Sequence, residues 1–124
     1  MEEEIKILLV DDEPDFTHPT ASWLTSEGYY VMVAPDGESA LRIIKENTPD
    51  ITFLDLKMPG MDGVEVLKRI RAFNKDMPVV LVTAYVEDPK VREISQYGIS
   101  GVFYKGDDFI ELLSLIKTCV KKQA

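Results

Sequence analysis

Five short aliphatic runs recur along the chain, and their spacing constrains the fold more than any other feature. The runs begin 24, 22, 28 and 22 residues apart, at residues 5–10, 29–34, 51–54, 79–83 and 101–104. They are continuously apolar, which is typical of strands covered on both faces. With 124 residues the chain has the length of one domain, so we expect residues 1–124 to form a single unit.

The segments between the runs carry apolar residues at helical spacing. Between the third and fourth runs Val64, Leu67, Ile70, Arg71 and Phe73 follow this period, and after the fifth run Phe109, Leu112, Leu113, Ile116 and Val120 do so. Strands that alternate with helices predict a parallel sheet with helices on both faces. We therefore expect an α/β, doubly wound fold of five strands and five helices.

Several residues predict where the helices begin and end. Asp62 and Asp108 are each followed three residues later by a glutamate, which predicts an N-cap with its capping partner. Gly28 and Gly98 lie where helices should end. Pro19 disturbs the first helical segment, so that helix either begins near residue 17 or bends at the proline.

Polar side chains stand at the carboxyl ends of four runs. Asp11 and Asp12 follow the first, Asp55 follows the third, Thr83 ends the fourth and Lys105 follows the fifth. Ligands of open α/β sheets bind at this edge, so these distant residues predict one site. His18 is the single histidine and has no second ligand beside it, so we assign it no role.

Three carboxylates that share a crevice repel one another, and a cation relieves this repulsion. Oxygen ligands with few protein contacts suit Mg²⁺. Asp11, Asp12 and Asp55 carry three negative charges, which Mg²⁺ and Lys105 would balance. Because a carboxylate can act as a nucleophile towards phosphorus, the pattern favours phosphoryl transfer to Asp55 over acid–base catalysis.

The same residues carry a resemblance to a known family. Asp11-Asp12-Glu13-Pro14, the DLKMPGMDG stretch at 55–63, Thr83-Ala84 and Lys105 resemble the receiver domain of two-component response regulators, over residues 5 to 121. The resemblance implies a flavodoxin-like sheet with strand order 2-1-3-4-5.

It also implies roles for individual residues. Asp55 would accept a phosphoryl group from the phosphohistidine of a sensor histidine kinase or a phosphotransfer protein. Asp12, Asp55 and the backbone carbonyl of Lys57 would ligate Mg²⁺, with Asp11 helping through water. Lys105 would pair with a phosphoryl oxygen.

Thr83 would turn to bond a second phosphoryl oxygen, Ala84 would leave room for the group, and Tyr85 together with Lys57 would flank the pocket. Two positions depart from the family pattern. Val102 stands where most receivers carry an aromatic residue, and Gly106 stands where a proline usually follows the lysine.

The resemblance implies a signalling switch that acts on a downstream effector protein or domain and is not classed as an enzyme. The last helix carries a broad apolar stripe with Ile110, Leu115 and Cys119 at its flanks, so a phosphorylation-dependent dimer there is a hypothesis. The net charge of −8 argues against direct nucleic-acid binding. No apolar run is long enough for a membrane span, and the acidic N-terminus is unlike a leader, so we expect a cytoplasmic protein.

Alternatives remain at this point. A haloacid-dehalogenase-like phosphatase would need an acid two residues after Asp55, where Lys57 stands. A flavin-binding domain would need a phosphate loop in place of the acidic Asp11-Asp12-Glu13. A receiver-like binding module without phosphorylation is the third alternative. A stand-alone receiver is favoured over a piece of a longer regulator, although both have this sequence.

Overall fold

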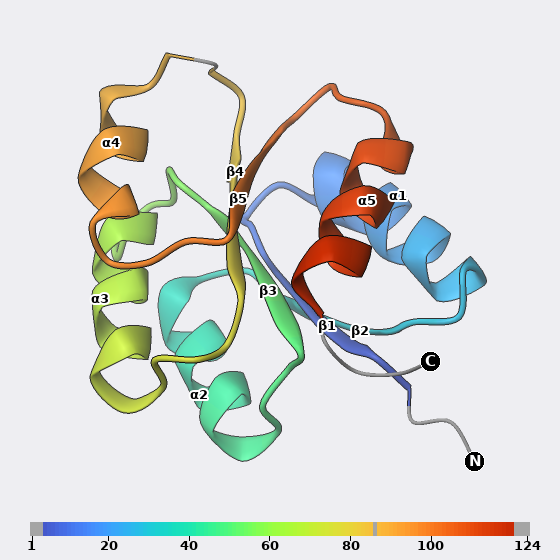
Figure 1. Ribbon diagram of the computed structural model, residues 1–124, viewed down its shortest axis with the longest axis horizontal. Helices are drawn as coiled ribbons and strands as arrows, with labels where there is room; N and C mark the ends of the chain where they lie inside the picture. The colour runs from blue at the N-terminus through green and yellow to red at the C-terminus, as the bar shows by residue number, and fades with distance from the viewer. Residues whose placement is uncertain (1–3, 86, 121–124) are drawn as a thin grey trace.

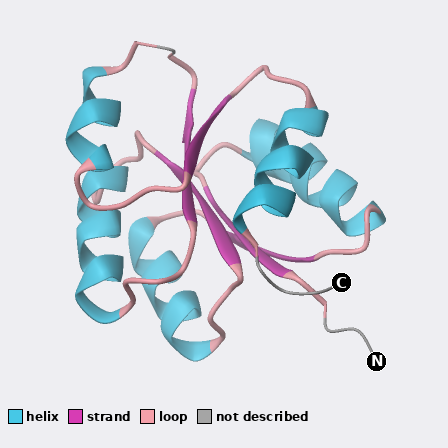
Figure 2. Ribbon diagram, viewed as in Figure 1, coloured by secondary structure: helices cyan, strands magenta, loops and turns pink. Residues whose placement is uncertain are grey.

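The computed structural model describes residues 4–85 and 87–120, in which strands and helices alternate along the chain (Figures 1 and 2). The strands are β1 (Lys6–Val10), β2 (Tyr30–Ala34), β3 (Ile51–Asp55), β4 (Val79–Thr83) and β5 (Gly101–Tyr104). The helices are α1 (Pro14–Ser26), α2 (Gly37–Glu46), α3 (Gly63–Phe73), α4 (Pro89–Ser95) and α5 (Phe109–Cys119). Each predicted strand is present within one residue of its expected bounds.

The strands form one parallel sheet in the order β2-β1-β3-β4-β5, which confirms the predicted fold class. Helices α1 and α5 cover one face, and α2, α3 and α4 cover the other (Figure 1). Side chains of β1 alternate between the two cores, with Leu8 and Val10 facing α2–α4 and Ile7 and Leu9 facing α1 and α5. Two apolar layers thus hold the sheet between the helices.

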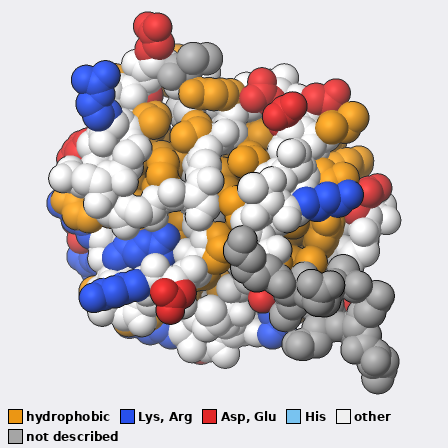
Figure 3. Space-filling view, viewed as in Figure 1, with side chains coloured by type: hydrophobic (Ala, Val, Ile, Leu, Met, Phe, Trp, Pro, Cys, Tyr) orange, Lys and Arg blue, Asp and Glu red, His pale blue; other side chains and the backbone are white. Residues whose placement is uncertain are grey.

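The expectation that every run is covered on both faces is wrong for the edge strands. Tyr30 and Val33 of β2 are exposed, because β2 is hydrogen-bonded only to β1. On the other edge, β5 buries Phe103 fully and its neighbours only in part. Hydrophobic side chains are visible there between α4 and α5 (Figure 3). The three central strands are the ones that match the prediction.

For α1 the sequence left two alternatives, a start near residue 17 or a bend at Pro19. The helix begins at Pro14, three residues earlier than the first alternative, and continues through Pro19. Proline suits the first helical position because it lacks an N–H, and an N–H there would have no partner within the helix. Within the helix, the Thr20 hydroxyl donates to the Phe16 carbonyl at 2.6 Å. His18 is exposed on this helix.

The predicted N-caps form, but their glutamate partners do not return the bond. Asp62 accepts from the Glu65 N–H at 3.1 Å, whereas Asp108 accepts from the Ile110 N–H, one residue earlier than expected. The Glu65 carboxylate instead binds Arg69 at 2.9 Å. The chain turns with positive φ at both predicted end glycines, Gly28 and Gly98, just after α1 and α4.

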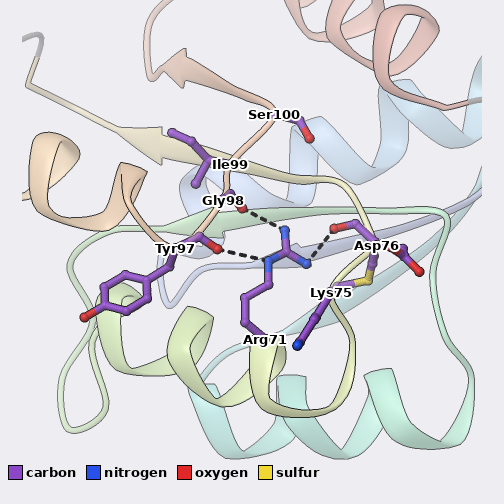
Figure 4. A pocket seen from close by; sticks show the side chains of 8 residues that line it. Arg71, Lys75, Asp76, Tyr97, Gly98, Ile99 and Ser100 are labelled. Carbon is purple, nitrogen blue, oxygen red and sulfur yellow. Dashed lines mark hydrogen bonds between the residues drawn. The ribbon is translucent and has the colours of Figure 1, made fainter.

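The Arg71 guanidinium joins the loops that lead into β4 and β5 at the amino edge of the sheet (Figure 4). Arg71, near the end of α3, donates to the carbonyls of Tyr97 and Gly98 after α4 at 3.3 and 2.8 Å. It also donates to the carbonyls of Asn74 and Met77 before β4 at 3.1 and 2.9 Å. These bonds hold the ends of α3 and α4 at the starts of β4 and β5. The helical period thus placed Arg71 correctly, but its role is to bind backbone and not to pack in the core.

Replacement of this guanidinium should destabilise the fold. We expect Arg71→Met to lower the free energy of unfolding in urea by about 2 kcal/mol, because four carbonyls lose a charged donor. Arg69→Met, which removes only an exposed ion pair with Glu65, is the matched control and should change it by less than about 0.5 kcal/mol. Equal losses in the two variants would contradict this role.

Candidate functional site

The carboxyl ends of the strands bring the predicted polar residues to one edge of the sheet. Asp55 is the last residue of β3, and Asp11 directly follows the neighbouring strand β1. One carboxylate oxygen from each of Asp11, Asp12, Glu13 and Asp55 lies within 4.8 Å of the others. Glu13 belongs to this cluster, although it was not among the predicted site residues.

A close approach of two backbones positions the end of β3, where Asp55 lies. The N–H of Gly63, at the start of α3, donates to the Leu56 carbonyl at 3.1 Å. A Cβ atom at Gly63 would lie 2.6 Å from the carbonyl oxygen of Asp55. Only glycine therefore allows α3 to begin against the end of β3, which explains the last residue of the DLKMPGMDG stretch.

Burial and charge crowding make the acidic cluster unfavourable when it holds only protein groups. Asp11 and Asp55 are 3% and 4% exposed, whereas Asp12 and Glu13 are exposed. Burial and the nearby charge of Asp11 raise the pKa of Asp55 to about 7, despite the opposing effect of Lys105. Burial likewise raises the pKa of Asp11. A bound cation would remove both penalties.

Lys105 reaches this cluster from the loop after β5. Its ammonium lies 2.9 Å from Asp11 Oδ2 and 3.8 Å from Asp55 Oδ1, and it also contacts Glu13 Oε1. Burial lowers the pKa of Lys105, but the bonds to Glu13 and Asp11 outweigh this effect and raise it. Lys105 is therefore held nearer to Asp11 and Glu13 than to Asp55.

The charge balance drawn from the sequence needs a correction. It counted three carboxylates, but the cluster contains four, because Glu13 folds back towards Asp11. The Glu13 N–H donates to Asp11 Oδ1 at 2.9 Å, which draws the glutamate into the site. A divalent cation and Lys105 would leave one net negative charge instead of none. The position of Glu13, two residues after Asp11 in the sequence, was the signal that could have placed it in the site.

The donor set fits a hard divalent cation such as Mg²⁺. Carboxylate oxygens of Asp11, Asp12 and Asp55 converge there, two of them from buried side chains with raised pKa values. Lys57 lines the adjacent pocket, and the assignment of its carbonyl as a ligand stays a prediction.

A pocket of about 260 Å³ opens beside Asp55, and its lining includes Lys57, Thr83, Ala84, Tyr85 and Lys105. Thr83 is buried, and its hydroxyl oxygen accepts from the Tyr85 N–H at 3.1 Å. The structure therefore brings the residues predicted from the ends of β3, β4 and β5 around one opening.

Lys57 and Tyr85 form one wall of this pocket, which we call the Lys57–Tyr85 wall. The Lys57 ammonium lies 4.7 Å from the centre of the Tyr85 ring and 3.4 Å from Asp88 Oδ2. Asp88 precedes Pro89 and caps α4. Sequence reasoning missed Asp88, although an aspartate before a proline is a common helix start.

Val102 and Gly106, the two positions that depart from the family pattern, each have a defined place in the structure. Val102 packs against the core under α2–α4, whereas Phe103 is buried on the opposite face. Tyr104 lies directly beside Thr83 in the β4–β5 ladder. Gly106 has φ of +100°, which proline cannot adopt because its ring holds φ near about −65°.

The apolar stripe of α5 is mostly explained by packing. Leu115 and Cys119 are half-buried against the core under α1 and α5, and only Ile110 of the three flanking residues is widely exposed, at 67%. A dimer through α5 stays a prediction. Among the described residues, none of the helices has the length and apolarity that a membrane crossing demands.

Comparisons with known proteins agree with this geometry. A family model described as "Response regulator receiver domain" matches residues 7–117. Sporulation initiation phosphotransferase F of Bacillus subtilis is 36% identical over 112 residues, which are 90% of each chain. A Mycobacterium tuberculosis protein named as the probable transcriptional regulatory protein NarL is 32% identical over 121 residues, 96% of this chain and 56% of NarL. Vibrio cholerae chemotaxis protein CheY4 superimposes with a TM-score of 0.88 at 28% identity, covering 95% of this chain and all of that one.

The strain in the acidic cluster leads to a prediction on stability. In EDTA at pH 8, Asp55→Asn should raise the free energy of unfolding by on the order of 2 kcal/mol, because it removes a buried charge that faces Asp11. The raised pKa of about 7 means that the native-state penalty is complete above pH 7. It fades as the pH falls towards the ordinary value of 3.8, because the native carboxyl takes up a proton.

Urea unfolding between pH 4.5 and 8 would test this, with the exposed neighbour Asp12→Asn as the control that should gain less. A gain for Asp55→Asn that is absent at pH 8, or that grows as the pH falls, would contradict it.

Proposed function

The chain belongs to the response regulator receiver domain family of two-component systems, and on that premise we propose that Asp55 is its phosphoacceptor. The observation that carries this proposal is the meeting of three groups at one pocket. A buried carboxylate, a lysine ammonium and a threonine hydroxyl, from Asp55, Lys105 and Thr83, line the same opening. These are the groups that phosphoryl transfer to a carboxylate requires.

In the proposed reaction a carboxylate oxygen of Asp55 attacks the phosphorus atom of the donor. The bond from phosphorus to the nitrogen of the donor phosphohistidine breaks, and its electron pair leaves with the histidine. Lys105 shifts from Glu13 and Asp11 to a phosphoryl oxygen, a short move because its ammonium is already 3.8 Å from Asp55. Thr83 turns its hydroxyl from the Tyr85 backbone towards a second oxygen.

Mg²⁺, when bound by Asp11, Asp12, Asp55 and the Lys57 carbonyl, would neutralise the acidic cluster and the phosphoryl oxygens. Support for this ion comes from the convergent carboxylate oxygens and the two raised pKa values. Ala84 has only a methyl side chain at the pocket and leaves space for the incoming group.

The donor would be the phosphohistidine of a sensor histidine kinase or a phosphotransfer protein, and the output would reach a downstream effector, with an α5 dimer as one candidate route. In this proposal the protein catalyses only its own phosphorylation and dephosphorylation, in the cytoplasm where such kinases act. NarL and several other relatives are longer than this chain.

Incubation with acetyl phosphate and Mg²⁺, followed by intact mass spectrometry, tests the acceptor. We expect one phosphoryl adduct on the native chain, and neither an adduct on Asp55→Asn nor one in EDTA. A native chain that binds Mg²⁺ and forms no adduct would refute autophosphorylation from small donors. An adduct on Asp55→Asn would refute the choice of residue.

The Lys57–Tyr85 wall should set how long the phosphate lasts. We expect Tyr85→Ala to shorten the half-life of the adduct by about threefold or more, because an exposed ring beside the pocket limits the approach of water. The decay is followed by mass after the donor is removed. Tyr30→Ala, which removes an exposed ring on β2 far from the pocket, should leave the half-life unchanged. An unchanged half-life in Tyr85→Ala would reject the role of the ring.

A further inference from the structure

Asp88 is a buried charge whose two oxygens face different partners. Its side chain is 3% exposed, although it belongs to the surface segment that leads into α4. Oδ1 accepts from the Lys90 N–H at 2.9 Å and caps the helix. Oδ2 faces the Lys57 ammonium at 3.4 Å. The carboxylate thus links the start of α4 to the loop that follows the proposed phosphoacceptor.

Capping alone does not explain a buried charge at this position. Asn serves as an N-cap about as well as Asp, and the caps of α2 and α5 are exposed aspartates. Burying a carboxylate is costly unless a cation accompanies it. Here the cation at the buried oxygen is Lys57, which itself comes from the β3–α3 loop.

Lys57 in turn needs an anchor if its side chain is to keep one place. The side chain is 57% exposed, and a free lysine of this kind samples many rotamers. A contact with an aromatic face at 4.7 Å is weak at an exposed site. A carboxylate that is itself fixed by burial and by a helix cap can hold the ammonium on the ring.

We propose that Asp88 is a positioning residue of the acceptor pocket: it holds the Lys57 ammonium against the Tyr85 ring and so keeps the Lys57–Tyr85 wall closed to water. This inference rests on the proposed function of Asp55. Asp88 does not line the pocket, and it acts through Lys57, which does.

The step that the wall impedes is hydrolysis of the aspartyl phosphate. A water oxygen bonds to phosphorus, and the bond from phosphorus to the Asp55 carboxylate oxygen breaks with its electron pair left on the carboxylate. One water proton stays on the attacking oxygen and the other passes to a phosphate oxygen, so the products are inorganic phosphate and free Asp55. Water must enter opposite the Asp55 oxygen, and a fixed wall narrows that approach.

The test compares adduct decay in four proteins: the native chain, Asp88→Asn, Lys57→Gln and the double variant. Each is phosphorylated with acetyl phosphate and Mg²⁺, freed of donor by gel filtration and followed by intact mass. We expect Asp88→Asn, which keeps the cap, to shorten the half-life by about three- to fivefold. In the Lys57→Gln background the same change should have no further effect, because the ammonium that Asp88 holds is gone.

Asp108→Asn is the matched control, since it changes the N-cap of α5 in the same way and should leave the half-life as it is. An unchanged half-life in Asp88→Asn would overturn the inference, and so would an equal shortening with and without Lys57, which a structural role alone would give. If the native chain forms no adduct, the proposed autophosphorylation from small donors fails and this inference fails with it. If it forms one and only the variants disagree, the inference alone fails.

Discussion

Two buried carboxylates at the ends of adjacent central strands are the constraint around which the carboxyl edge of this sheet is organised. Asp11 and Asp55 lie where β1 and β3 end, and both are nearly inaccessible to water. Their mutual repulsion and burial oppose folding, and this cost must be met by the apolar layers on both sides of the sheet. Lys105, which is far from Asp11 in the sequence, offsets part of this cost by its contact with the Asp11 carboxylate.

Under the proposed function, the same unfavourable arrangement would make the site reactive. An acidic cluster with a net negative charge attracts a cation, and a cation allows a phosphoryl dianion to approach a carboxylate that would otherwise repel it. Lys105 is shared among three carboxylates, so it can leave one of them and still keep a carboxylate partner. If the proposed function holds, the strand ends have a lower stability because they carry the phosphoacceptor chemistry, as is common for functional sites.

The sequence alone predicted the strands, their parallel arrangement and the meeting of Asp55, Thr83 and Lys105, because these follow from local patterns and from one rule about strand ends. The strand order came from the family resemblance and not from the pattern. Exposure of Tyr30 and Val33 could not be read from the runs, because an edge strand is defined by which strands pair and not by its own residues.

Side-chain pairings between distant loops escaped prediction for a related reason. Glu13 meets Lys105 across 92 residues, and Lys57 meets Asp88 across two separate loops. The local sequence does not show which distant charge such a residue will meet, because only the geometry of the folded edge brings the two together.

Helix α4 differs from its neighbours in what holds it, and this difference connects the pocket to the surface. It buries one residue, Ile94, whereas α3 and α5 bury two or more each. Polar contacts also hold α4 in place. At its start Asp88 contacts Lys57 and Lys90 contacts Asp62, and just after its end the Arg71 guanidinium binds the Gly98 carbonyl. The Lys90–Asp62 pair joins two partly exposed charges, and such contacts are individually weak and easily exchanged. If the position of Lys57 changed, moving α4 would therefore cost less free energy than moving a helix that is held mainly by apolar burial.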